Sequence, residues 1–200
     1  GDKVILSISR ARKVNKEDHP VLFNVVEEMS VASGLSKPPE VYILDEAAPN
    51  AFATGTRPDR AAVVVTAGLL ERLTRDELQG VIAHEISHIK HRDVVYLTVM
   101  AVMVGTVVIL ADFARRVLFY GGGTRRRTSS SSRGAAPLYL LAIVLILLAP
   151  LVARLMYLAL SRRREYLADA GAALATRYPE GLASALEKIE QSWSPLTSAN

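Results

Sequence analysis

Cysteine is absent from this chain of 200 residues. Its absence excludes a disulfide framework, a thiolate metal site and a cysteine nucleophile. Any transition-metal site must therefore be built from histidine, aspartate or glutamate. Aromatic residues are also scarce, at 6%, and the arginines cluster beside apolar runs instead of interleaving with aromatics as in a nucleic-acid surface. The net charge of +4 therefore favours a membrane interface and excludes nucleic acid as the expected partner.

Length and hydrophobicity limit what the chain can build. With 200 residues, 50% of them hydrophobic, it can hold one compact domain together with membrane-spanning segments. It opens with Gly1 instead of Met, and the apolar stretch that follows is too short for a signal peptide. We therefore expect a fragment of a longer protein.

Two long apolar segments, residues 94–114 and 138–160, predict transmembrane helices. A helix of about 20 residues rises roughly 30 Å, which is the thickness of a bilayer's hydrocarbon core. The second segment contains Pro150, where we expect a kink, and Arg154, whose long side chain can reach an interface or a partner. The alternative is a pair of buried core helices, but a chain of this size has little bulk with which to cover them.

Residues 115–137 lie between the two apolar segments and are rich in Gly, Ser and Arg, without hydrophobic periodicity. They predict a flexible basic loop, whose arginines either contact acidic lipid or are simply solvated. The other end of the apolar segments is equally basic, at Lys90, Arg92 and Arg162 to Arg164. The positive-inside rule therefore does not decide the orientation in the membrane.

The patterning of residues 1–93 predicts a soluble α+β region. A helix is expected from Pro20, a good first helical residue, to just before Gly34. Strand patterns follow at residues 40–45, 50–55 and 61–68, and the turn residues between the last two predict a hairpin. Residues 161–200 are expected to supply the C-terminal part of the same domain.

The stretch VIAHEISHIKH carries the chemistry. Thr74 and Glu77 form a capping-box pattern that predicts the start of its helix. Four residues advance about 400° around a helix, so His84 and His88 project from one face and can reach one ion. Zinc suits two neutral imidazoles, and a catalytic zinc takes a third protein ligand and a water. Glu85 lies about 100° from His84, beside the metal, where it can take a proton from that water.

One Zn²⁺ per chain is therefore predicted, with Glu85 as the catalytic acid/base. The alternative is a charged helix face whose histidines bind nothing. His91 also falls near this face, but it lies about 10 Å along the axis from His84, too far to share a zinc with bonds near 2 Å. We expect an interfacial or supporting role for His91, and a structural one for His19 beside Pro20.

The third ligand must come from another segment, and SRRREYLADAG at residues 161–171 offers acidic residues. If both apolar segments cross the membrane, this stretch returns to the side of the histidines. Glu165 can then complete the ligand set, while Asp169, one turn on, can accept a hydrogen bond from a ligating imidazole. Alternatively, both acids pair with Arg162 to Arg164 on a solvated helix face, and composition alone does not decide between the two.

Three motifs in this order resemble the M48 family of zinc metalloproteases. They are NAFATG at residues 50–55, HEISH at residues 84–88 and REYLADA at residues 164–170. The resemblance runs from about Arg12 to the end of the chain. It implies a mainly helical, zincin-like α+β domain with a small β-sheet and hairpin. It also implies a two-helix transmembrane hairpin inserted between the zinc-ligand motifs.

Carried over by residue, the resemblance implies His84, His88 and Glu165 as zinc ligands. It implies Glu85 as the catalytic acid/base and Asp169 as a supporting acid. It further implies an extended edge that binds peptide by strand addition, made of Asn50, Ala51, Phe52 and Ala53. The family's usual upstream transmembrane helices and downstream His-Pro segment have no counterpart here. Candidates for an oxyanion partner are His91, Tyr166 and Arg162 to Arg164.

The function that the resemblance implies is that of a membrane-embedded zinc endopeptidase. Its expected substrates are unfolded, misfolded or damaged membrane proteins, which indicates protein quality control. Its expected location is the inner (cytoplasmic) membrane, as a multi-pass protein embedded in the lipid bilayer with a cytoplasmic catalytic face. Two alternatives remain open: a prenyl-protein (CAAX-type) zinc protease, like that of a related eukaryotic group, and a non-catalytic, zinc-stabilised membrane scaffold.

Overall fold

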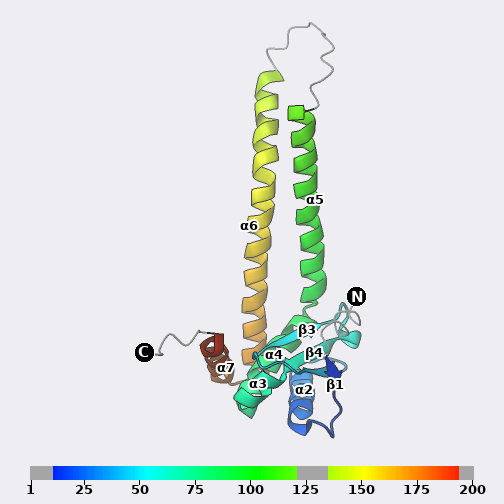
Figure 1. Cartoon of the computed structure of the whole chain (residues 1–200), viewed down its shortest axis with the longest axis vertical. Coiled ribbons are helices and arrows are strands. Elements are labelled where there is room, and N and C mark those ends of the chain that lie inside the picture. Colours follow the sequence, from blue (N-terminus) through cyan, green and yellow to red (C-terminus); the bar gives the residue numbers. More distant parts are fainter. Residues whose placement is uncertain (1–10, 121–134, 194–200) are drawn as a thin grey trace. The chain divides into compact units, whose positions relative to one another are not determined.

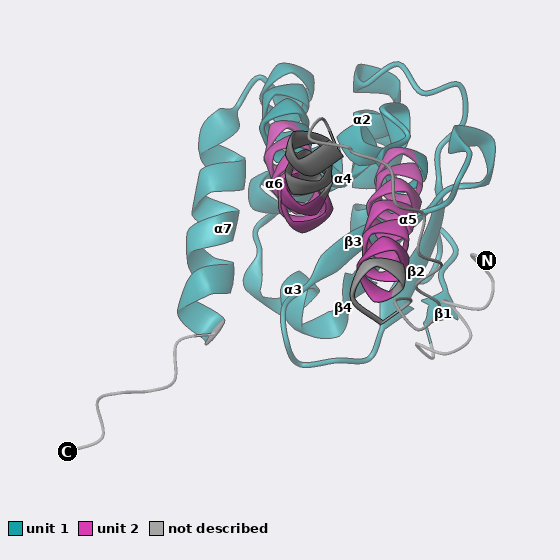
Figure 2. Cartoon of the chain, turned by 90° about the horizontal axis from the view of Figure 1, so that it is seen from above, with its two compact units in different colours: residues 1–95, 164–200 teal, residues 96–163 magenta. Residues whose placement is uncertain are grey.

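The computed structural model describes residues 11–120 and 135–193, and Figure 1 labels most of their helices and strands. The chain divides into two units, residues 1–95 with 164–200 and residues 96–163, which Figure 2 shows in teal and magenta. The first unit combines the two segments in which the sequence places the soluble domain. All residues that carry the predicted chemistry belong to this unit.

A small four-stranded sheet, in the order β1-β2-β4-β3, forms one layer of the first unit. Its strands are β1 (Arg12–Lys13), β2 (Glu40–Leu44), β3 (Ala51–Thr54) and β4 (Ala62–Thr66). Every residue of β4 is buried, which suits its β-branched sequence AVVVT. Strands β3 and β4 pair antiparallel across the short helix η1 (Pro58–Arg60), so the predicted hairpin is confirmed. Strand β3 is left at the edge of the sheet.

Helix α2 (Pro20–Ala32) begins at the predicted proline and buries Leu22, Val25, Val26 and Met29. Gly34 follows it with φ of +76°, a left-handed conformation that glycine adopts at little cost. Helix α3 (Ala67–Arg72) was not expected, because residues 61–68 read as one strand. The strand ends at Thr66, whose hydroxyl accepts a hydrogen bond from Leu69 N and caps the helix.

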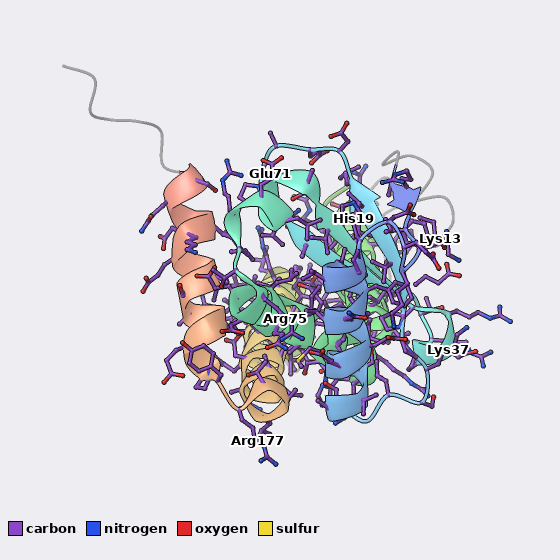
Figure 3. The ribbon with its side chains drawn as sticks, turned by 90° about the horizontal axis from the view of Figure 1, so that it is seen from below. Lys13, His19, Lys37, Glu71, Arg75 and Arg177 are labelled. Carbon is purple, nitrogen blue, oxygen red and sulfur yellow. The ribbon has the colours of Figure 1, made fainter. Side chains whose placement is uncertain are left out.

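Helix α4 (Arg75–Lys90) has the predicted capping box between Thr74 and Glu77. It packs against α2, and Arg75 at its start, labelled in Figure 3, lies 2.6 Å from Glu28 of α2. Helix α7 (Pro179–Trp193) packs on another face of α4. The two helices approach closely at Gly80, where an added Cβ would lie 2.6 Å from the backbone nitrogen of Leu182.

Two long helices carry the apolar segments. Helix α5 (Asp93–Tyr120) contains one stretch, Asp93–Arg116, that is long and apolar enough to cross a membrane. Helix α6 (Ala135–Thr176) continues through Pro150 and through Glu165 to Thr176, well beyond the expected span at residues 138–160. The expected loop at residues 115–137 is shorter on both sides, since α5 and α6 extend into it, and residues 121–134 lie outside the described part of the chain.

Candidate metal centre

Two histidines on α4 face each other at the core of the candidate site. The Nε2 atoms of His84 and His88 lie 3.1 Å apart, and their rings meet edge to face with centroids 4.8 Å apart. Both side chains are mostly buried. Their alignment follows from the four-residue spacing on one helix, as the sequence predicts.

A carboxylate from another helix completes the group. Glu165 Oε2 of α6 lies 3.6 Å from His84 Nε2 and 3.8 Å from His88 Nε2. The three potential ligand atoms all lie within 4.8 Å of one another. A tetrahedral zinc with bonds of about 2.0 to 2.1 Å places two ligand atoms about 3.3 Å apart. The three residues therefore have both the chemistry and the spacing of a zinc site.

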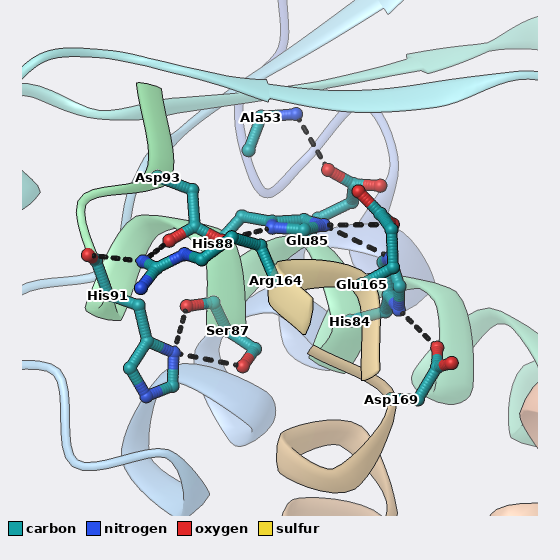
Figure 4. Close-up of polar contacts among 10 residues, drawn as sticks. All are labelled: Ala53, His84, Glu85, Ser87, His88, His91, Asp93, Arg164, Glu165 and Asp169. Atoms are coloured by element: carbon teal, nitrogen blue, oxygen red, sulfur yellow. Dashed lines mark hydrogen bonds and ion pairs between the residues drawn. The ribbon is translucent and has the colours of Figure 1, made fainter. Parts of the chain in front are cut away.

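Each histidine ring also contacts an acidic side chain through its other nitrogen, as Figure 4 shows. Asp169 Oδ1 lies 2.9 Å from His84 Nδ1, where the sequence places a supporting acid. Asp93 Oδ2 lies 2.7 Å from His88 Nδ1. A proton on each Nδ1 satisfies these carboxylates and leaves each Nε2 lone pair free for a metal.

Asp93 is a site residue that the sequence reading missed. The sequence predicts it only as the last residue before a membrane span, yet its side chain is 5% exposed and lies against His88. The turn between α4 and α5 is responsible, because Arg92 adopts a left-handed φ of 54° and sends the chain back toward the histidines. Glycine is the usual sequence signal for such a turn. Because no glycine is present here, the sequence does not predict the turn.

The electrostatics of the site favour neutral imidazole. Burial lowers the pKa of His84, and the neighbouring His88 lowers it further, whereas Asp169 and Glu165 raise it. The net shift is downward, so the ring stays neutral at pH 7. A neutral ring is the form that binds a metal.

Glu85 occupies the position predicted for the catalytic acid/base. Its Oε2 accepts a hydrogen bond of 2.8 Å from the backbone N–H of Ala53 on β3. Burial raises the pKa of Glu85 to about 7, although the nearby His88 side chain and the Ala53 hydrogen bond oppose the rise. A carboxyl group with such a pKa can both take up and release a proton near neutral pH.

Ala51 to Ala53 lie in edge strand β3, as expected, and Asn50 directly precedes the strand. Asn50 is tied to β4, since its N–H donates to Thr66 Oγ1 over 2.8 Å and its carbonyl accepts from Thr66 N over 2.9 Å. Asn50 and Thr66 are thus a hydrogen-bonded pair, and pairs alternate along an antiparallel ladder. The N–H and C=O groups of Ala51 and Ala53 therefore point away from β4, toward the open edge.

The remaining candidates are not members of the ligand group. The Nδ1 of His91 bonds to Ser87 O over 2.8 Å, and in Figure 4 its ring points away from His84 and His88. His19 lies at the N-terminal end of α2, as Figure 3 shows. Tyr166 is 72% exposed. Arg164 donates to the carbonyl oxygen of His91 over 2.8 Å and pairs with Asp93.

The fold brings two histidines of α4 and a glutamate of α6 together as a candidate metal centre. Residues 17–195 match the sequence profile of Peptidase family M48, and the chain belongs to this family. It is 52% identical over 199 residues to "Protease HtpX homolog" of Dictyoglomus thermophilum, covering 100% of this chain and 63% of that protein. It is 47% identical over 195 residues to the protein of the same name from Thermoanaerobacter pseudethanolicus, covering 98% of this chain and 65% of that protein.

The chain thus spans less than two thirds of the length of these relatives. Its fold resembles the crystal structure of S. mikatae Ste24p, with a TM-score of 0.62 at 21% identity. The likeness covers 94% of this chain and 46% of that one. At this identity the comparison concerns the fold alone, and it agrees with the α+β arrangement described above.

Proposed function

We propose that this protein is a membrane-embedded, zinc-dependent endopeptidase. The observation that carries the proposal is the convergence of His84, His88 and Glu165 within 4.8 Å, with Glu85 held beside them. Two imidazoles and one carboxylate are the ligand set of several zinc proteases. Membership of a peptidase family and the relatives named as proteases support the same reading.

The three ligand residues would hold one zinc ion per chain. When bound, zinc would polarise the scissile carbonyl and make a water molecule nucleophilic near neutral pH. Asp93 and Asp169 hold the rings of His88 and His84 with Nε2 toward the metal. Glu85 uses Oε2 for the Ala53 hydrogen bond, which leaves Oε1 to take a proton from the attacking water and deliver it to the leaving amine.

An extended peptide fits the open edge of β3 beside this centre. The free groups of that edge are the N–H and C=O of Ala51 and the C=O of Ala53, because Glu85 occupies the Ala53 N–H. A substrate strand pairing with Ala51 would bring its backbone along the edge toward Glu85. Recognition through backbone groups requires an unfolded or locally extended chain, whatever its side chains.

The apolar surface of the long helices supports the proposed membrane embedding. In α5, large hydrophobic side chains such as Val102, Ile109 and Phe113 are more than 60% exposed. In the described part of α6, Leu147, Leu151 and Leu155 are more than 50% exposed. Such surfaces are rarely left to water. We infer a multi-pass inner-membrane protein with a cytoplasmic catalytic face, which suits unfolded membrane proteins as substrates and a role in quality control.

The test is Glu85→Gln, assayed on detergent-purified protein with an unfolded casein as substrate. A protease loses cleavage by about 100-fold or more, because a general base contributes about that much, yet it keeps its zinc because Glu85 is no ligand. The matched control is Glu71→Gln, an exposed residue of α3, which retains cleavage. Undiminished cleavage in Glu85→Gln would contradict the mechanism. Zinc binding without cleavage even in the unaltered protein would favour the scaffold alternative, and cleavage of a farnesylated CAAX peptide alone would favour the prenyl-protein protease.

A further inference from the structure

A charged pair lies next to the metal group, against His88. The side chains of Asp93 and Arg164 form an ion pair and are 5% and 19% exposed, respectively. Asp93 is the first residue of α5, and Arg164 lies in the C-terminal part of α6. Burying a charge pair this deeply costs desolvation free energy, so we expect this pair to have a function.

Both members of the pair touch the machinery that would hold zinc. The second carboxylate oxygen of Asp93 lies 2.7 Å from His88 Nδ1. A guanidinium nitrogen of Arg164 donates to the carbonyl oxygen of His91, at the C-terminal end of α4, over 2.8 Å. Arg164 also directly precedes the third candidate ligand, Glu165. One side chain thus links the end of the histidine helix, the residue that orients His88 and the backbone that carries Glu165 (Figure 4).

This link joins two segments that are distant in sequence, since His91 and Arg164 are 73 residues apart. Packing alone brings α6 close, because Ala168 and Ala172 are buried. Apolar burial is not directional, however, so it does not by itself set the rotation of α6. A guanidinium that bonds a carboxylate and a carbonyl at once fixes both the rotation and the axial position of α6.

We propose that Arg164 is a positioning residue for the metal centre, acting through Asp93 and the His91 carbonyl. By this route the orientation of His88 and the position of Glu165 depend on the same ion pair. Loss of either charge releases both ligands and leaves the other charge buried without a partner. The inference rests on the proposed zinc site and adds the residues that set its affinity.

The test is the zinc affinity of the full chain, purified in detergent, by competition with a chromophoric chelator. Arg164→Gln and Asp93→Asn should each raise the Kd for zinc about 10-fold to 100-fold, the usual effect of removing a residue that supports a metal ligand. The double variant should lose less zinc-binding free energy than the sum of the two single variants, because neither charge is then left without its partner. The control is Arg163→Gln, an exposed neighbour on the same helix, which should bind zinc like the unaltered chain.

Melting of each metal-free variant separates positioning from general folding. We expect metal-free Arg164→Gln to melt cooperatively and to gain less thermal stability from added zinc than the unaltered chain does. Arg164→Lys keeps the charge beside Asp93 and should recover part of the lost affinity. Unaltered zinc affinity in Arg164→Gln would overturn the inference and leave the proposed function standing. The same conclusion would follow if metal-free Arg164→Gln were unfolded and metal-free Arg164→Lys were unfolded as well. Failure of the unaltered chain to bind zinc would overturn both.

Discussion

Glu85 and Ala53 are joined by a hydrogen bond of 2.8 Å between a side-chain oxygen and a backbone N–H. The bond connects the acid of the HEISH helix to the edge strand along which a peptide would lie. The ladder with β4 uses neither the N–H nor the C=O of Ala53, so this N–H is available to Glu85. In the proposed mechanism, the same strand would therefore set the position of both the acid and the substrate.

Ala53→Pro tests this coupling, because proline removes the N–H without removing a bond of the ladder. Proline is tolerated at the edge of a sheet where its nitrogen faces outward. We expect kcat on casein to fall about 10-fold to 100-fold, since a misplaced general base loses much of its effect, while zinc content stays unchanged. The pH profile of kcat should also move, because the Ala53 hydrogen bond lowers the pKa of Glu85.

The matched control for that experiment is Ala53→Gly, which retains the N–H. It should keep most of the activity and the pH profile of the unaltered chain. Equal activity in the proline and glycine variants would show that the Ala53 hydrogen bond does not position Glu85.

Glu165→Ala addresses the third ligand directly. Elemental analysis of the purified chain should give about one zinc per molecule, and much less in the variant, because two imidazoles alone bind zinc weakly. Glu187→Ala, an exposed glutamate of α7, serves as the control and should keep its zinc. Full zinc content in Glu165→Ala would mean that the third ligand lies elsewhere.

Gly171→Ala tests how closely α6 must approach α4. An added Cβ at residue 171 would lie 2.3 Å from Ser87 Oγ, a buried atom. We expect a loss of about 1 to 3 kcal/mol of stability from overpacking and weaker zinc binding, because α6 carries Glu165. The double variant with Ser87→Ala should recover part of both losses, since it removes the obstructing oxygen. No loss in the single variant would show that α6 has room to move.

Glu77 predicts an acid-sensitive contact between α4 and α7. Burial alone would raise its pKa, but hydrogen bonds from Lys188, Ser184 and Thr74 outweigh that effect and lower the pKa to about 2. A carboxyl group with a lowered pKa stabilises the folded state at pH values above its unfolded pKa of about 4.3. That contribution, at most about 3 kcal/mol, is lost as the pH falls from about 5 toward 2.

Urea unfolding of the chain between pH 7 and pH 3 measures this contribution. Glu77→Gln should be less stable at pH 7 by about 1 to 3 kcal/mol, because Lys188 loses its charged partner. It should also lose part of the pH dependence of stability. Glu71→Gln, on the exposed surface of α3, should keep both. A pH dependence that is identical in Glu77→Gln and the unaltered chain would contradict the lowered pKa.

The parts of the fold that depend on neighbours in sequence could be predicted from the sequence. The capping box at Thr74 and Glu77, the alignment of His84 with His88 and the β3–β4 hairpin all follow from local geometry and are present. Helix α3 was missed because Thr66 ends the strand by capping a helix, and a threonine in a β-branched run gives no warning of this role.

Only the part of the site that lies on helix α4 could be predicted from the sequence. His84 and His88 are four residues apart on one helix, and Glu85 directly follows His84. The sequence alone therefore determined the arrangement of these three residues. Whether Glu165 faced those histidines or paired with nearby arginines was undecided, because it depends on how α6 packs. Only the tertiary structure brought Glu165 and Asp169 to the histidines, and paired Asp93 with both His88 and Arg164. These residues meet across long stretches of chain, and no local periodicity encodes such contacts.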